Sequence, residues 1–182
     1  MVSPERGACM TKEILRSTVS RADMGEEKYE SLIKAIERLP VLSKEIMKGN
    51  PQPFKDFFST FDDVFLRGAL GGPPAIGRKA VEARLEWAAD RGKGFADGVT
   101  DYKHIRCDVS ENLVSLVSLE FGRIRSAGRA DFEDFHVLSI HNIRFEGGEW
   151  KLGMRVAYRL DSAQDTEAIM QLVSGTARKP GE

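Results

Sequence analysis

Residues 145–160 read FEGGEWKLGMRVAYRL, a two-glycine turn followed by a run in which apolar and polar residues alternate. Such alternation predicts a strand with one buried face. That face carries Trp150, Leu152, Met154, Val156 and Tyr158. Three more stretches with a period of two precede it, separated by short turn signals, at 99–109, 113–125 and 132–146. Short connections between long strands are typical of consecutive hairpins, so the sequence predicts a four-stranded antiparallel sheet.

Helical periodicity precedes this sheet. Apolar residues recur every three or four positions over 26–39, and Pro40 is expected to kink that helix or to begin a second one. Asn50 and Pro51 are expected to start the next helix, with Asn50 as its cap. The buried stripe of that helix carries Phe54, Phe57, Phe58 and Phe61. Residues 77–90 predict a third amphipathic helix.

Helices followed by a long antiparallel sheet indicate the α+β class, with the helices packed on one face of the sheet. A strongly curved sheet around helices leaves a cone-shaped central cavity, where a small molecule would bind. No internal repeat or linker divides the chain, so we expect one domain over 26–162. Residues 1–25 are expected to form a flexible arm, with the start at Met1 or Met10 left open, and 163–182 a short helix and a polar tail.

Composition narrows the classes of function. The 27 basic and 28 acidic residues give a formal net charge of −1, which argues against a nucleic-acid partner. No apolar run approaches the length of a membrane helix, and the first ten residues lack a signal-peptide core. Two cysteines, Cys9 and Cys107, make neither a disulfide framework nor a metal site. We therefore expect a cytoplasmic protein with no metal, no cofactor and no membrane partner.

Several short motifs occur in one order along residues 30–160. They are GNPQPF at 49–54, DDV at 62–64, GGP at 71–73 followed by GRKAV at 77–81, VSENL at 109–113 and FEGGEWKL at 145–152. In this order they resemble the nuclear transport factor 2-like superfamily, in the branch of SnoaL-like (polyketide-cyclase-like) and kinase-association-like domains. The resemblance implies a cystatin-like roll with a central cavity. It implies either cofactor-independent lyase, isomerase or cyclase chemistry or no catalysis, since the superfamily contains both kinds of member.

The last strand departs from the pattern that is frequent in this branch, which reads WRLVHRHAD. Met154 and Val156 stand at its two histidine positions, and Tyr158 stands at its acidic position. The face that alternation assigns to the cavity is therefore apolar, which favours an apolar small molecule as ligand. The residues predicted to line the cavity are Phe54, Phe57, Phe58, Phe61, Trp87, Trp150, Met154 and Val156.

Candidate catalytic residues lie on the strands. Asp134 and His136 are two apart and point the same way, so the carboxylate can orient the imidazole as a general base or can itself take a proton. His141 falls on the opposite face, near a position where the resemblance implies a histidine. Tyr158 is a candidate oxyanion donor. Ordinary structural roles at a sheet face, a dimer interface or the core are the alternative for all four.

Other polar residues receive structural interpretations. His104 is expected on the exposed face of its strand, because Ile105, Cys107 and Val109 are assigned to the buried face. Asp62 and Asp63 are expected to make turn contacts, although a carboxylate at this point is catalytic in some proteins of the superfamily. Glu120 is either a buried base or a surface carboxylate that pairs with Arg123 or Arg144.

Two hypotheses about function stay open at this point. The first is a small-molecule-binding protein with an apolar pocket that catalyses acid–base chemistry of the lyase, isomerase or cyclase type. The second is a non-catalytic domain of the same fold that binds a ligand, assembles into dimers or binds another protein. Apolar residues on the outer face of several strands lead us to expect a homodimer.

Overall fold

The computed structural model describes residues 24–160 and 163–174 except 94, 127 and 129. Residues 1–23 of the arm predicted over 1–25, and residues 175–182 of the segment predicted as a short helix and polar tail over 163–182, therefore lie outside the described residues. The helices are α3 (Glu26–Met47), α4 (Gln52–Phe57), α5 (Arg78–Gly92) and α6 (Ala163–Ser174). The strands are β1 (Phe65–Arg67), β2 (Ala75–Ile76), β3 (Phe95–Val109), β4 (Leu113–Ser126), β5 (Glu133–Glu146) and β6 (Glu149–Leu160).

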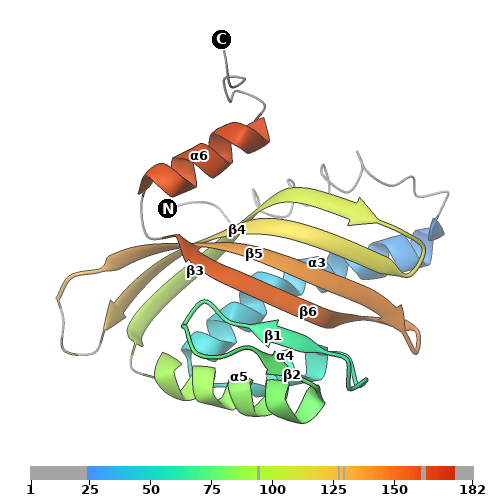
Figure 1. The fold of residues 1–182 in the computed structure, drawn as a ribbon, viewed down its shortest axis with the longest axis horizontal. Coiled ribbons are helices and arrows are strands. Elements are labelled where there is room, and N and C mark those ends of the chain that lie inside the picture. The colour runs from blue at the N-terminus through green and yellow to red at the C-terminus, as the bar shows by residue number, and fades with distance from the viewer. Residues whose placement is uncertain (1–23, 94, 127, 129, 161–162, 175–182) are drawn as a thin grey trace.

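The strands form one curved, open sheet in the order β2-β1-β6-β5-β4-β3. Strands β3 to β6 pair antiparallel with their sequence neighbours, as the turn signals predict, and β1 adds to β6 in parallel. Helices α3, α4 and α5 lie against one face of the sheet, and α6 lies on the opposite side (Figure 1). The predicted α+β class, with helices packed in a curved sheet, is confirmed.

Helix α3 forms the centre of the core. Its apolar stripe, which includes Leu32, Ile36 and Leu39, is fully buried under the sheet. Pro40 lies inside this helix, which continues to Met47 without a second start. Pro40 has no N–H to donate to the preceding turn, but buried Leu42 beyond it keeps the segment packed in place.

The phenylalanine helix is shorter than its spacing predicts. Helix α4 ends at Phe57, and Phe58 is extended, with ψ at 146°. The chain turns here because it pairs with β6: the N–H of Ser59 donates to the carbonyl of Leu152 at 2.9 Å. Phe61 consequently leaves the stripe and is 57% exposed. The expected cap is also absent, because the Asn50 side chain donates to Glu45 and makes no cap hydrogen bond.

Two β-bulges decide which side chains face inward. In β6, Leu152 pairs with Ile143 and Met154 pairs with Asn142, so Gly153 is an extra residue. Beyond this bulge the alternation is inverted. Arg155 and Ala157 are buried, while Met154, Val156 and Tyr158 lie on the outer face. The prediction that these three residues share the inward face with Trp150 and Leu152 is therefore wrong.

The second bulge lies in β3. His104 pairs with Ser118 and Arg106 pairs with Val117, which leaves Ile105 as the extra residue. Tyr102 and His104 before the bulge are buried, and so is Cys107 after it. The prediction that His104 is exposed is wrong for this reason: its side chain is 5% exposed.

Candidate functional site

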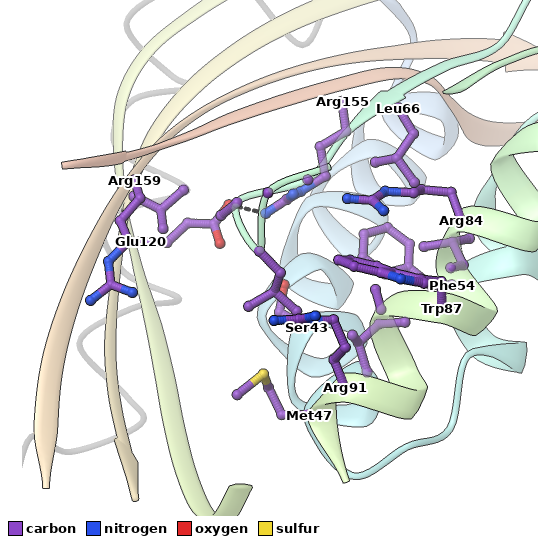
Figure 2. Close-up of a pocket in the computed structure, with 18 of the residues that line it drawn as sticks. Ser43, Met47, Phe54, Leu66, Arg84, Trp87, Arg91, Glu120, Arg155 and Arg159 are labelled. Carbon is purple, nitrogen blue, oxygen red and sulfur yellow. Dashed lines mark hydrogen bonds and ion pairs between the residues drawn. The ribbon is translucent and has the colours of Figure 1, made fainter. Parts of the chain in front are cut away.

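A cavity of about 540 Å³ lies between the inner face of the sheet, helices α3 and α5, and the segment that follows β1. Apolar side chains make up much of its wall, among them Phe54, Leu66, Leu85, Trp87 and Val137. The charged side chains that line it are Arg84, Arg91, Glu120, Arg155 and Arg159 (Figure 2). The volume is in the range of cavities that hold small organic molecules.

The polar centre of the cavity is an ion pair between Glu120 on β4 and Arg155 on β6. Nη2 of Arg155 lies 2.6 Å from Oε1 of Glu120, and the side chains are 9% and 4% exposed. The bulge at Gly153 creates this pair, because strict alternation would have turned Arg155 outward. Glu120 therefore pairs with Arg155, and neither of the expected partners, Arg123 and Arg144, holds it.

A tyrosine hydroxyl lies close to this ion pair. The Tyr102 hydroxyl lies 2.7 Å from Oγ of Ser43, which lines the cavity. Burial raises the pKa of Tyr102, and the negative charge of Glu120 raises it further by a smaller amount. The phenol is therefore neutral and serves as a hydrogen-bond donor or acceptor.

Two histidines are buried behind the cavity wall. Nδ1 of His104 lies 2.8 Å from Oγ of Ser118, and burial lowers the pKa of His104 to about 4. His141 is fully buried, and among the described residues neither of its ring nitrogens has a hydrogen-bond partner. Burial, then the charges of Arg155 and His104, lowers the pKa of His141 well below its usual value. Both imidazoles are neutral at pH 7, and neither lines the cavity.

The four predicted catalytic residues do not come together. Asp134 is exposed and pairs with Arg123 at 2.9 Å. His136 shares the outer face with Asp134 and packs edge-on against Phe121, with ring centroids 5.5 Å apart. Tyr158 also lies on the outer face, because the bulge at Gly153 turns it outward, and it is 43% exposed. Of the four residues, His141 alone points inward. The Asp134–His136 pair therefore lies on the outer face of the sheet, away from the cavity.

Of the residues predicted to line the cavity, Phe54 and Trp87 do so. Phe57 and Phe58 are buried in the core, and the indole N–H of Trp150 donates to the carbonyl of Lys28 at 3.2 Å. The remaining three lie away from the cavity for the reasons given above; they are Phe61, Met154 and Val156. The cavity is consequently more polar than an apolar inward face of β6 would make it.

The sequence carried signals for most of the missed residues. The missed residues Arg84 and Arg91 stand at i and i+7, with the predicted residue Trp87 at i+3, and this spacing places all three on one face of a helix. Gly153 inside a long strand indicates a bulge, and a bulge there turns Arg155 and Arg159 inward.

Asp62 and Asp63 have structural contacts, as expected. A carboxylate oxygen of Asp62 accepts from the N–H of Arg78 at 2.8 Å, at the start of α5. Asp63 pairs with Arg144 at 2.7 Å, and the hydrogen bonds from Arg144 lower the pKa of Asp63. These contacts fix the segment between α4 and β1.

Within the described residues, no group of three or more His, Cys, Asp or Glu side chains is arranged to hold a metal ion. In the same part of the chain, no helix has the length and apolar character needed to span a membrane.

Solved structures share this architecture, although no protein-family model and no curated protein matches the sequence. A protein assigned as a scytalone dehydratase from Novosphingobium aromaticivorans DSM 12444 superposes with a TM-score of 0.60 at 18% identity, over 76% of this chain and 88% of that one. A nuclear transport factor 2-like protein with a cystatin-like fold from the same organism gives a TM-score of 0.57 at 16% identity, over 80% and 90%. A third structure is assigned as a calcium/calmodulin-dependent protein kinase type II association domain from Thiobacillus denitrificans ATCC 25259. It gives a TM-score of 0.54 at 18% identity, over 66% of this chain and 90% of that one. The chain therefore has the cystatin-like fold of nuclear transport factor 2-like proteins, as the order of its sequence motifs implies.

Proposed function

We propose that the cavity binds a small organic molecule and that Glu120 acts there as the general base of a proton-transfer reaction of the lyase or isomerase type. The observation that carries this proposal is the ion pair between Glu120 and Arg155, which is buried yet lines the cavity. A carboxylate that lines a cavity can take a proton from a bound molecule. Buried charges are costly to retain, so a buried pair on a cavity wall is a candidate for chemistry.

The ion pair also provides a positive charge to stabilise the negative charge that forms on the substrate during the reaction. When Glu120 takes a proton from a carbon next to a carbonyl group, the C–H electron pair moves into the substrate and its oxygen becomes negative. Glu120 is then neutral, and the positive charge of Arg155 is free to stabilise the new oxyanion. The buried site keeps the same net charge throughout. Return of the proton from Glu120 to a second carbon completes an isomerisation. In an elimination, the electron pair forms a double bond to the adjacent carbon while the leaving group departs with its bonding electrons. The proton on Glu120 then passes to the leaving group, which restores the carboxylate.

The surroundings suit this chemistry. Apolar side chains such as Phe54 and Val137 limit access of water to the substrate. Burial keeps the Tyr102 phenol neutral, and its hydroxyl, which contacts Ser43 on the cavity wall, can donate to a substrate oxygen once it turns from that partner. The similarity to a structure assigned as a dehydratase supports a lyase-type reaction, at the level of fold.

The proposal can be tested without knowing the natural substrate. The compound 5-nitrobenzisoxazole is a neutral aromatic probe of general bases. A base removes the proton from its ring carbon, the C–H electrons form a nitrile, and the N–O bond breaks to give a coloured phenolate. We expect saturable turnover by the protein and a loss of about 100-fold or more in kcat/KM for Glu120→Gln.

Asp134→Asn is the matched control, because Asp134 lies on the neighbouring strand and faces outward. This variant should turn over the probe at the unchanged rate. If Glu120→Gln unfolds because Arg155 loses its partner, the double variant Glu120→Gln/Arg155→Gln removes both charges and keeps the test valid. Equal rates for the protein and a folded Glu120 variant would contradict the proposal and would favour a binding domain without catalysis.

A further inference from the structure

The wall of the cavity that faces Glu120 carries two arginines and one tryptophan, all on α5. The Cζ atom of Arg84 lies 3.7 Å from the centre of a Trp87 ring, and Cζ of Arg91 lies 4.9 Å from the same side chain. Figure 2 shows these three side chains on the α5 side of the cavity and Glu120 across from them on the strands. Stacking on an indole holds a guanidinium in place while leaving its N–H groups free to donate.

Two of the four arginines that line the cavity have an acidic partner among the described residues, and two do not. Arg155 is compensated by Glu120, and Arg159 is compensated by Glu133. Arg84 and Arg91 have no acidic partner among the described residues, and Nη2 of Arg84 is buried without a hydrogen-bond acceptor there. Burial, and then the charge of Arg91, lowers the pKa of Arg84, so the like charge of Arg91 disfavours the charged form of Arg84. A bound anion would relieve both the missing hydrogen bond and the repulsion.

The backbone next to Arg84 leaves room for its guanidinium. A Cβ atom on Gly72 would lie 2.5 Å from both Nη1 and Nη2 of Arg84, closer than atoms can approach. Gly72 also has a positive φ of 82°, which other residues rarely adopt. A glycine at this position therefore lets the guanidinium lie against the main chain at the cavity.

We propose that Arg84 and Arg91 bind the carboxylate of a small organic acid whose apolar body lies against Trp87 and extends toward Glu120. This inference rests on the proposed function, because it names the class of molecule that the same cavity takes. The apolar part of the wall accounts for the body of the ligand. The two arginines, which have no acidic partner in the described part of the chain, account for its charge. Glu120 and Arg155, on the opposite wall, meet the end of the molecule that reacts.

The test compares two probes of nearly the same shape, naphthalene-2-carboxylate and the uncharged naphthalene-2-methanol, by isothermal titration calorimetry. We expect the carboxylate to bind more tightly to the protein, and Arg84→Gln/Arg91→Gln to weaken it by about tenfold or more, since charge-assisted hydrogen bonds are lost. Binding of the alcohol should change less than about twofold, because the apolar wall remains. Added salt should weaken the binding of the carboxylate and leave the binding of the alcohol unchanged.

Arg106→Gln is the matched control, because Arg106 is an exposed arginine that pairs with Asp108 outside the cavity. Glutamine keeps helix propensity, so the α5 variants are expected to fold. Equal affinities of the two probes, equal loss for both probes in the α5 variant, or no carboxylate binding at about 1 mM would overturn the inference. These outcomes are independent of turnover of the neutral 5-nitrobenzisoxazole, so failure of the anion site and failure of the proposed base can be told apart.

Discussion

Replacing Arg155 by Met should destabilise the protein strongly, because it leaves Glu120 as a buried charge without a partner. With 2.6 Å between Nη2 and Oε1, the attraction at an effective dielectric constant of 20 is about 6 kcal/mol. Part of this gain offsets the cost of burying the arginine, which the substitution removes. The expected net loss in the free energy of unfolding is therefore about 3–5 kcal/mol.

The double variant Arg155→Met/Glu120→Leu removes both charges and should be much closer to the unsubstituted protein, within about 2 kcal/mol. The four proteins form a double-mutant cycle, in which urea unfolding at pH 7 is followed by circular dichroism. If Glu120→Leu, which leaves Arg155 as the unpaired buried charge, loses as much as Arg155→Met, the coupling energy is at least about 4 kcal/mol. The same cycle on the exposed pair Arg123–Asp134, whose side chains are 61% and 63% exposed, should give less than about 1 kcal/mol.

Additive losses at Arg155 and Glu120, with a coupling energy as small as that of the exposed pair, would refute the reasoning. They would mean that the two side chains do not meet in the interior. The bulge at Gly153 would then not turn Arg155 inward, and the cavity would lose the group on which its chemistry depends.

Three further predictions concern a buried histidine, the end of α4 and the outer face of the sheet. Stability should fall as the pH drops from 6.5 to about 4, because the unfolded chain binds protons there that the buried His104, with its pKa of about 4, and His141 do not bind in the folded protein. The loss from His104 reaches about 3 kcal/mol. In urea unfolding, His104→Gln should remove this part of the pH dependence, while the part from His141 stays. Phe57→Ala should lower the free energy of unfolding by about 3–5 kcal/mol, because Phe57 is fully buried. Phe61→Ala should lower it by less than about 1 kcal/mol, because Phe61 is 57% exposed. Similar losses for both variants in thermal unfolding would contradict the position at which α4 ends. Light scattering should give twice the chain mass of 20.3 kDa, because apolar side chains on the outer face of the sheet favour a homodimer, and a monomer at micromolar concentration would refute this.

Strands β3 to β6 and their order were predictable from the sequence because a period of two over long runs survives in any half-buried sheet. Strands β1 and β2, and the parallel pairing of β1 with β6, were not predicted, because runs of three and two residues carry no such period. On each of the two bulged strands, the faces were predictable on one side of the bulge only. A single extra residue, Ile105 or Gly153, inverts every assignment beyond it, and its position depends on packing between strands that are distant in the sequence. This explains why His104 was assigned outward and Met154 inward.

The cavity was less predictable than the sheet. Phe54 and Trp87 could be read as lining residues from their apolar character, but arginines on an amphipathic helix are usually solvated. Only the fold shows that the Arg84–Trp87–Arg91 face meets the sheet across an open volume. The end of α4 at Phe57 depends in the same way on a tertiary contact, the pairing of Phe58 with Leu152.

The most direct test is a crystal structure of the protein with naphthalene-2-carboxylate bound. We predict density inside the cavity, with the carboxylate within about 3 Å of the Arg84 guanidinium and the rings extending from Trp87 toward Glu120. Density on the outer face of the sheet against Met154, Val156 and Tyr158, or a cavity that stays empty at saturating concentration, would contradict the account.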